Sequence, residues 1–380
     1  MTEAAAEAAK VADGERVSFT SGGETIVGRL FAAAFGEGPA PAVAIIGPMT
    51  YVKEQSPVQY ARRLAGNGYT ALIFDPRYRG ESGGEPRCLE DPVAKVEDLR
   101  AAVGYLAGRP EVDRGRLGVV GICMGGNTAV HAAADDPLIK VVAAVTPHFR
   151  NAAADAQWLG GAQAVAARLE RGRQAKATYE ATGRVEYVPG VHSQRTDVGM
   201  PGLAPWTWYQ EQADRGVWEN QHAVMSEVAL LSYESLSAAA RLTKPFLLVH
   251  GANCALPEQA ERHFAVVPTP GPNRPNATSQ SSPPPKNSIC SPTHHTWRST
   301  TTQWSWMPPP HALPTGSRVT LAPAKVTAGA TRRRAFRVRN GTAESRSGQA
   351  GRHCAPTRSA KRNCTVAVNF TRELRAKDQQ

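Results

Sequence analysis

The sequence lacks acidic residues over a long stretch near its end, because residues 266–343 contain no aspartate and no glutamate. Residues 266–380 hold 18 Lys and Arg against 3 Asp and Glu, whereas residues 1–265 hold 26 basic and 30 acidic residues. The net charge of +11 therefore comes from the C-terminal part alone. The first 265 residues have the mildly acidic balance of an ordinary soluble protein.

The chain also lacks the marks of a secreted, membrane-spanning or zinc-binding protein. No run of about 18 apolar residues could cross a bilayer, and the N-terminus has no apolar segment of a signal peptide. Neither a CxxC pair nor the spacing of a disulfide framework or zinc site occurs among the cysteines, which are Cys88, Cys123, Cys254, Cys290, Cys354 and Cys364. We therefore expect a cytoplasmic protein with no metal, no cofactor and no membrane contact; the oligomeric state is not readable.

Apolar segments alternate with amphipathic ones along the first 265 residues. β-Forming residues on either side of Gly22-Gly23 predict an opening hairpin. Short continuous apolar runs predict buried strands at residues 42–46, 69–74, 117–120, 141–145 and 246–249. Helical spacing is present at residues 59–65, 93–106 and 127–134. This alternation predicts an α/β fold, with a mostly parallel sheet and helices on both faces.

Between about residues 149 and 242 the strand–helix alternation pauses, which indicates a helical cap inserted over the strand ends. The segment is rich in large aromatic residues, which are Trp158, Trp206, Trp208, Tyr209 and Trp218. They form either an aromatic substrate pocket or the small core of the cap itself, since large rings serve both purposes.

The most informative motif is Gly-Ile-Cys-Met-Gly-Gly at residues 121–126, between a predicted strand and a predicted helix. A nucleophile flanked by glycines in this position forms a tight turn called the nucleophile elbow. Cys123 would lie at a helix N-terminus, where the helix dipole favours the thiolate. So tight a turn needs neighbours without side chains, which are Gly121, Gly125 and Gly126. The alternative is that Cys123 is a small core residue in a glycine-rich turn.

Four ordered motifs together resemble the dienelactone-hydrolase-like and peptidase-S15-like branch of the α/β-hydrolase superfamily. They are the loop Gly-Pro-Met-Thr-Tyr-Val-Lys-Glu-Gln at residues 47–55, the turn Asp-Pro-Arg-Tyr-Arg-Gly-Glu-Ser-Gly-Gly at 75–84, the helix containing Asp98 and residues 100–105, and the elbow at 121–126. The resemblance covers roughly residues 16–265 and implies an α/β-hydrolase fold.

The resemblance implies that Cys123 attacks the carbonyl of a small-molecule acyl substrate and forms an acyl-thioester. It also implies that the backbone N–H groups of Met49 and Met124 form the oxyanion hole. The side chains of these two methionines would then line a pocket or pack in the core. The turn at residues 75–79 is interpreted as structural support beside the site.

The expected triad is incomplete, so its acid and its histidine stay unassigned. The acid should follow the strand at residues 246–249, near Ala252, but no carboxylate occurs there before Glu258, which we place on the next helix. Asp155 is a weak substitute for the acid. His250 is interpreted as a strand-end packing residue, and nothing in the sequence positions His263 or His311 as a base.

The segment after residue 267 reads either as a disordered basic tail or as an out-of-frame translation of the end of the domain. In the other frame the codons for residues 295–321 permit an acidic, amphipathic helix opening with His-Val-Glu-Val-Tyr-Asp, and a stop is permitted at residues 324–325. In that case the chain has lost its catalytic histidine and last helix, and His294, His295 and His311 are accidents of frame. We favour the frameshift.

We divide the chain into a disordered N-terminus (1–14), an α/β-hydrolase domain (15–267, with the cap at about 149–242) and the tail (268–380). Three functions remain open. The first is a hydrolase of ester, thioester or lactone bonds, and the second is an impaired pseudo-hydrolase. The third is a nucleic-acid-binding protein that uses Arg332, Arg333 and Arg334, which we do not favour because a frameshift would produce the basic charge without selection.

Overall fold

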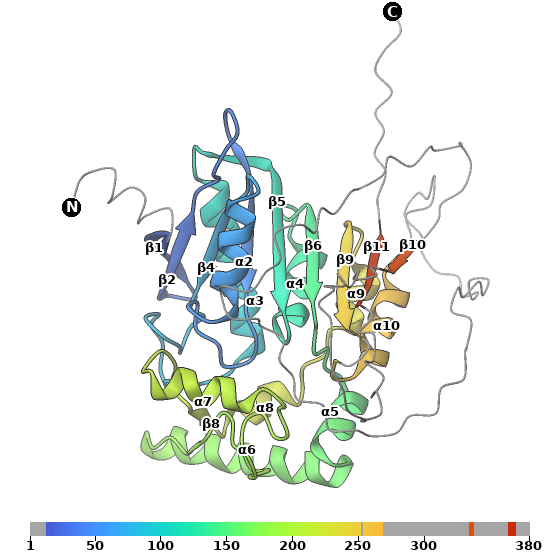
Figure 1. Cartoon of the computed structure of the whole chain (residues 1–380). Coiled ribbons are helices and arrows are strands. Elements are labelled where there is room, and N and C mark those ends of the chain that lie inside the picture. The colour runs from blue at the N-terminus through green and yellow to red at the C-terminus, as the bar shows by residue number, and fades with distance from the viewer. Residues whose placement is uncertain (1–12, 252–253, 269–333, 338–363, 370–380) are drawn as a thin grey trace, which may run out of the picture.

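The computed structural model describes residues 13–251 and 254–268 and, for the backbone only, the short segments 334–337 and 364–369 (Figure 1). A nine-stranded sheet forms its centre, in the order β1-β2-β4-β3-β5-β6-β9-β11-β10. The strands are β1 (Glu15–Ser21), β2 (Glu24–Phe31), β3 (Ala40–Ile46), β4 (Thr70–Phe74), β5 (Val112–Ile122), β6 (Val141–Val145), β9 (Phe246–Gly251), β10 (Arg334–Arg337) and β11 (Cys364–Asn369).

The central strands β4, β3, β5, β6 and β9 are parallel, while β1 and β2 form the predicted antiparallel hairpin. The parallel strands coincide with the apolar runs of the sequence, because a strand covered on both faces needs apolar side chains on both. The predicted α/β-hydrolase fold is thereby confirmed. The sequence did not predict β11, which pairs antiparallel with β9, or β10 beside it.

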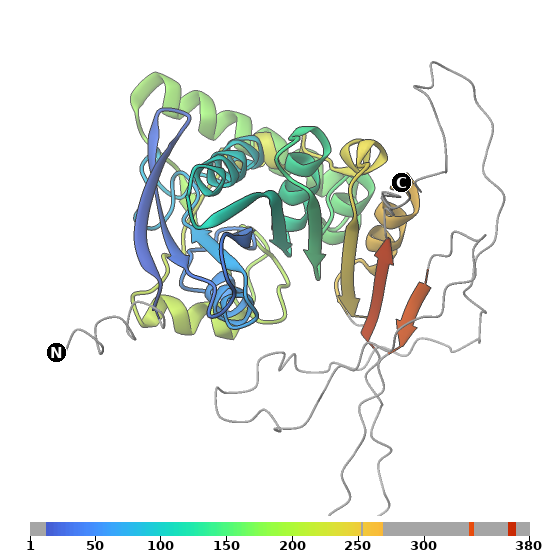
Figure 2. The same ribbon diagram turned by 90° about the horizontal axis from the view of Figure 1, so that it is seen from above.

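Helices lie on both sides of the sheet, and Figure 2 shows α2 on one side with α3 and α4 on the other. The helices of the main domain are α2 (Ser56–Ala65), α3 (Pro92–Ala107), α4 (Gly125–Asp135), α9 (Leu236–Arg241) and α10 (Pro257–Val266). The larger apolar core joins α3, α4, α9 and α10 to one face of the sheet. The smaller core joins α2 to the other face.

The α2 face is covered unevenly. Over β3 and β4, side chains such as Val43 and Ile73 are buried. Over β5, β6 and β9, the side chains that alternate onto this face are half-buried or exposed, namely Val120, Val141, Ala143, Val145, Leu247 and Val249. Val141 is 44% exposed. Val120 packs against the smaller core that contains α2. Among the described residues, no helix covers the other five, on β6 and β9, and we call these five residues the bare face.

The cap crosses the C-terminal ends of the parallel strands (Figure 1). It contains α5 (Ala152–Leu159), α6 (Ala162–Thr182), β7 (Tyr187–Val188), α7 (Trp206–Asp214), β8 (His222–Ala223) and α8 (Ser226–Leu230). The next helix, α9, has already returned to the main domain, where it packs on α4 and α10. None of the described helices has the length and apolarity needed to cross a membrane.

Several predictions concern residues that the structure does not describe. These are most of the N-terminal segment, Ala252, most of the tail with His294, His295 and His311, and Arg332 and Arg333. Arg334 begins β10. The frameshift and the nucleic-acid contact of the tail therefore stay predictions.

Candidate active site

Cys123 lies in the turn between β5 and α4 with a left-handed φ of 53°. The glycines around it allow three pieces of backbone to meet. A Cβ on Gly121 would lie 2.2 Å from the carbonyl oxygen of Gly125, and one on Gly125 would lie 2.5 Å from that of Gly47. A Cβ on Gly126 would lie 2.7 Å from Pro147. The geometry is that of a nucleophile elbow, which holds one side chain at the end of a strand.

The structure brings Met49, Cys123 and Met124 together, as their predicted roles require. Burial raises the pKa of the Cys123 thiol to about 11, while the backbone N–H groups of Met124 and Met49 and the ammonium of Lys95 oppose this rise. The nearby Cys254 adds to it. The N–H groups of Met124 and Met49, which come from two different loops, therefore lie close enough to the sulfur to lower the thiol pKa, and an oxygen bound to an attacked carbonyl carbon would form beside them.

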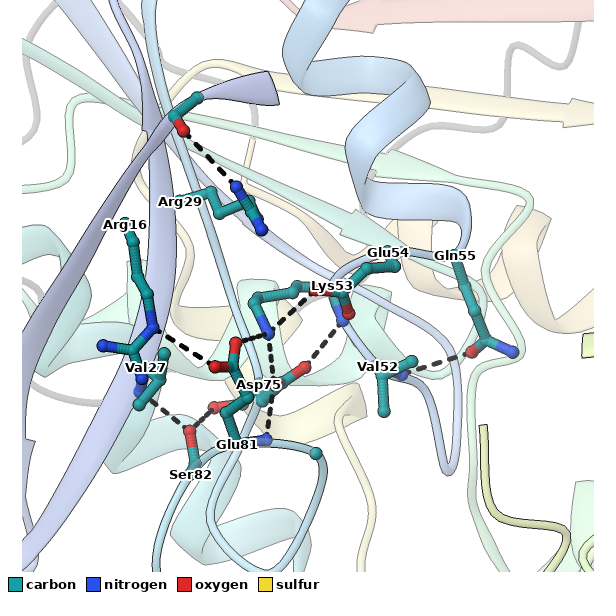
Figure 3. Close-up of polar contacts among 12 residues, drawn as sticks. Arg16, Val27, Arg29, Val52, Lys53, Glu54, Gln55, Asp75, Glu81 and Ser82 are labelled. Carbon is teal, nitrogen blue, oxygen red and sulfur yellow. Dashed lines mark hydrogen bonds and ion pairs between the residues drawn. The ribbon is translucent and has the colours of Figure 1, made fainter. Parts of the chain in front are cut away.

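The loop that carries Met49 is anchored by a buried ion-pair cluster just after it (Figure 3). The Lys53 N–H donates to Asp75 Oδ1 at 2.7 Å, and Lys53 Nζ lies 2.7 Å from Asp75 Oδ2 and 2.6 Å from Glu81 Oε2. Burial alone would lower the pKa of Lys53, but Asp75 and Glu81 raise it above its usual range. Helix α2 then begins at Ser56, so Lys53 and Glu54 lie in the turn before it.

The turn after β4 has a structural role, as the sequence predicted. Ser82 Oγ donates to the carbonyl of Asp75 at 2.7 Å and accepts from the N–H of Val27 at 2.9 Å. Arg77 Nε donates to the buried Asp98 at 2.7 Å. These contacts tie the turn to β2 and α3, and all of them are internal to the main domain.

The cap places its aromatic residues over the elbow. The side chains of Met49 and Met124 pack in one apolar cluster with Tyr209 and Trp218, and Trp158, Trp206 and Trp208 pack against it. The two interpretations of these rings therefore both describe part of the arrangement, since the rings contact one another and also cover the residues beside Cys123. Trp218 Nε1 donates to the Thr50 carbonyl at 2.6 Å, which fixes the cap to the loop of Met49.

The backbone N–H of His148 donates to the Cys123 carbonyl at 3.2 Å, but no imidazole of the described residues is hydrogen-bonded to the Cys123 sulfur. His263 Nε2 lies 3.0 Å from Ser235 Oγ and Nδ1 lies 2.8 Å from the Gln259 carbonyl, so its ring is held between α9 and α10. His250 is buried in β9 and its Nδ1 lies 3.0 Å from the Gly251 carbonyl. Burial lowers the pKa of His148 to about 3, and its ring packs edge-on against Trp158.

The two carboxylates weighed for the triad lie elsewhere. Glu258 is exposed in the first turn of α10, on the helix where the sequence placed it. Asp155 is buried and forms a 2.9 Å ion pair with Arg150. Burial raises the pKa of Asp155, and Arg150 opposes the rise. Because its charge is already matched by arginine, Asp155 is not available to orient an imidazole.

Sequence reasoning missed Asn127, which organises the backbone behind the elbow. Its Nδ2 donates to the carbonyls of Met124 at 3.1 Å and His148 at 2.7 Å. Its Oδ1 accepts from the N–H of Arg150 at 2.9 Å and from Ser235 Oγ at 2.7 Å. The signal was present, because an asparagine in the first turn of an otherwise small and apolar helix needs buried partners.

Residues 29–167 match the sequence model of the "Dienelactone hydrolase family". This part of the chain belongs to the dienelactone hydrolase family. The match includes the elbow, the loop of Met49 and the ion-pair cluster of Lys53, Asp75 and Glu81. The chain is therefore homologous to hydrolases, and the elbow lies where that family's fold presents a nucleophile.

Individual relatives agree with this assignment. An uncharacterized protein of Pseudomonas aeruginosa, PA2218, is 47% identical over 106 residues, which cover 28% of this chain and 29% of that protein. Its crystal structure matches with a TM-score of 0.58 and 27% identity over 66% of this chain and 81% of that chain. The "Thiohydrolase aneE" of Aspergillus aculeatus is 35% identical over 128 residues, which cover 34% of this chain and 39% of that protein.

A longer match is the "Polyketide transferase claH" of Penicillium crustosum, which is 29% identical over 67% of this chain and 86% of that protein. The two fungal relatives are named as a polyketide transferase and a thiohydrolase, and the Pseudomonas protein has no named activity. The sequence matches to PA2218 and aneE each span well under half of the relative's length.

Proposed function

We propose that the chain is an acyl hydrolase of the dienelactone hydrolase family that cleaves ester, thioester or lactone bonds of a small molecule through Cys123. The thiolate adds to the acyl carbonyl, the carbonyl π electrons move to oxygen, and the oxyanion is held by the N–H groups of Met49 and Met124. Collapse of the oxyanion breaks the bond to the leaving group, which departs as an alkoxide or thiolate and takes a proton from water, and leaves an acyl-Cys123 thioester that water then hydrolyses.

The observation that carries this proposal is the elbow turn itself, in which Cys123 has a left-handed φ and the glycines around it allow close backbone contacts. A core cysteine does not require a left-handed φ, and the N–H groups of Met49 and Met124 beside its sulfur agree with the proposed role. Among the three bond types we favour thioesters, because a relative is named a thiohydrolase and because a thiolate leaving group does not require a proton from a general acid.

The raised thiol pKa has a direct consequence for rate. With a pKa of about 11, only about one Cys123 side chain in 10⁴ is ionised at pH 7. Acylation should therefore rise about tenfold for each pH unit between 7 and 10. A base placed beside Cys123 would flatten this dependence.

The test is to incubate the full chain with p-nitrophenyl thiobutyrate, follow thiol release and identify the acylated residue by peptide mass spectrometry. We expect the acyl group on Cys123. Cys123→Ala should abolish the adduct, whereas Cys254→Ser is the matched control because that thiol lies nearby yet outside the elbow. An adduct on Cys254 instead, or release that Cys123→Ala leaves unchanged, would remove Cys123 from the mechanism.

The second candidate is the impaired pseudo-hydrolase, and the positions of the histidines favour it. No described imidazole is hydrogen-bonded to the sulfur, and that of His148, whose backbone contacts the Cys123 carbonyl, packs against Trp158 with a pKa lowered by burial. Without a base, Cys123 would form an acyl-enzyme that is not turned over. Loss of general base catalysis costs about 10²- to 10⁴-fold. Product release that stops near one equivalent per chain identifies this case, and steady release over many equivalents identifies a working hydrolase.

A further inference from the structure

Two peptide groups flank Met49, and each is held by a member of one buried ion pair. Lys95 Nζ donates to the carbonyl of Pro48 at 3.5 Å, and the N–H of Thr50 donates to Glu90 Oε2 at 3.0 Å. Lys95 and Glu90 also hydrogen-bond to each other through Nζ and Oε1. The pair therefore contacts the backbone immediately before and immediately after Met49.

The first of these contacts bears on the direction of the Met49 N–H. The carbonyl of Pro48 and the N–H of Met49 belong to one peptide plane, and in a trans peptide they point in opposite directions. A cation that holds the carbonyl on one side therefore turns the N–H to the other side, where Cys123 lies. Hydrogen bonding at the carbonyl also polarises the peptide group and strengthens its N–H as a donor.

The second contact holds a backbone conformation that is costly by itself. Thr50 has a left-handed φ of 62°, which a threonine rarely adopts. Its N–H is held by Glu90 and its carbonyl by the indole of Trp218. The ring of Tyr51 then lies under the ammonium, with Lys95 Nζ 5.2 Å from the ring centroid.

The stability of the fold does not by itself explain the pair. Glu90 is fully buried and Lys95 is 4% exposed. Removing two charges from water is costly, and well-packed apolar side chains of similar size often stabilise a protein equally well or better. Burial lowers the pKa of Lys95 while Glu90 opposes the shift; burial alone would raise the pKa of Glu90, but Lys95 and Arg79 lower it.

We propose that the Glu90–Lys95 ion pair is a positioning element that aims the Met49 N–H at the oxyanion by holding the peptide groups on both sides of Met49. The pair does not touch the reacting atoms. The inference rests on the proposed function, since it assigns the pair a role only in a step that forms an oxyanion.

Two reactions of the same thiol separate positioning from other effects. Acylation by p-nitrophenyl thiobutyrate forms an oxyanion, whereas alkylation by iodoacetamide displaces iodide at a saturated carbon and forms none. Both require the thiolate, so the ratio of the two rate constants cancels a change in thiol pKa. Peptide mass spectrometry reports the modification of Cys123 alone in both reactions.

The test variant is Glu90→Met/Lys95→Met, which removes both charges of the pair together. The buried Arg79 loses its interaction with Glu90 but keeps its hydrogen bonds to the carbonyls of Cys88 and Gln221. We expect the acylation-to-alkylation ratio to fall about 10²-fold, as for the loss of one oxyanion donor. Glu90→Gln keeps an acceptor for the Thr50 N–H and should lose less than the double variant. An unchanged ratio in a folded double variant would overturn the proposal, as would a Glu90→Gln loss equal to that of the double variant.

The matched control is Arg77→Met/Asp98→Asn, which removes another buried ion pair that contacts the same helix but not the loop of Met49. It should leave the ratio unchanged. If it lowers the ratio as much as the test variant does, the effect is general loosening and the proposal is wrong. A wild-type chain that is alkylated but never acylated at Cys123 would instead overturn the proposed function, and the proposed positioning role with it.

Discussion

The two faces of the central sheet differ in how they are covered. On one face α3, α4, α9 and α10 bury the alternate side chains of every parallel strand in the larger core. On the other, α2 covers β3 and β4 and contacts Val120 of β5 through the smaller core, while the bare face over β6 and β9 keeps Val141 44% exposed. The strands themselves are equally apolar on both faces, which is typical of a sheet that has helices packed against both of its faces.

This difference connects the fold with the incomplete site. Within the described residues, no helix covers the bare face and no imidazole is hydrogen-bonded to the Cys123 sulfur. A single C-terminal segment containing a His loop and a final helix would supply both, and the other reading frame permits such a segment. The frameshift hypothesis explains both shortages with one cause, and it remains a prediction about the coding DNA.

The largest effect is expected from restoring that segment. The coding DNA should be sequenced from the codon of Val249 to that of Lys325, and a chain that switches frame where that DNA places the break, which we expect between about Pro257 and Pro292, should be expressed. We expect hydrolysis to rise by about 10²- to 10⁴-fold, because a general base would be present, and the melting temperature to rise as the bare face is covered. Stop codons in the other frame before the His loop would contradict the hypothesis.

The next effect compares neighbours on one strand. Leu248 is 5% exposed in the larger core, whereas Leu247 is half-buried on the bare face. We expect Leu248→Ala to reduce the free energy of unfolding by about 2–5 kcal/mol through cavity formation, and Leu247→Ala to reduce it by less than about 1 kcal/mol. Urea denaturation measures both. Equal losses would show that the face is covered in solution.

A smaller effect concerns acid stability on the well-covered side. Burial between α9 and α10 lowers the pKa of His263 to about 4 from 6.5. As the pH falls, His263 of the unfolded chain is therefore protonated at a higher pH than His263 of the folded chain. The contribution of this histidine to the free energy of unfolding is complete above pH 6.5. It is lost as the pH falls toward 4, by on the order of 3 kcal/mol. His263→Gln should flatten this part of the stability profile, while the exposed His192→Gln should leave it unchanged.

The smallest expected change is in dye binding. An uncovered apolar surface binds the dye ANS, and Val141→Lys/Leu247→Lys should reduce its fluorescence by at least half. The free energy of unfolding should change little, because both side chains already contact water. Gln163→Lys adds a positive charge at an exposed site of the cap and is the control. Unchanged fluorescence in the double variant would place the dye elsewhere.

The sequence predicted the main domain because its strands have a simple signature. The runs at residues 42–46 and 141–145 became β3 and β6 almost without change, since buried parallel strands need continuous apolar residues. The elbow was found for a similar reason, as glycines on both sides of Cys123 are a local requirement. The cap was predicted only as an interruption, because its helices pack by contacts between distant segments.

Glu90 and Lys95 were not predicted as part of the site. In the helix at residues 93–106 the apolar stripe includes Val96 and Leu99, so Lys95 reads as a residue of the solvated face. That face is buried because the loop of Met49 covers it, which no local pattern reveals. The triad acid and histidine were left unassigned, and the described residues supply neither at Cys123.

The hydrogen bond from Trp218 to the Thr50 carbonyl links admission of the substrate to the chemistry. A cap that lifted to admit a substrate would withdraw that indole, and the Thr50 backbone would keep only one of its two hydrogen bonds to side chains. The loop of Met49 would be held less firmly in that open state and would regain its arrangement when the cap closed over the substrate.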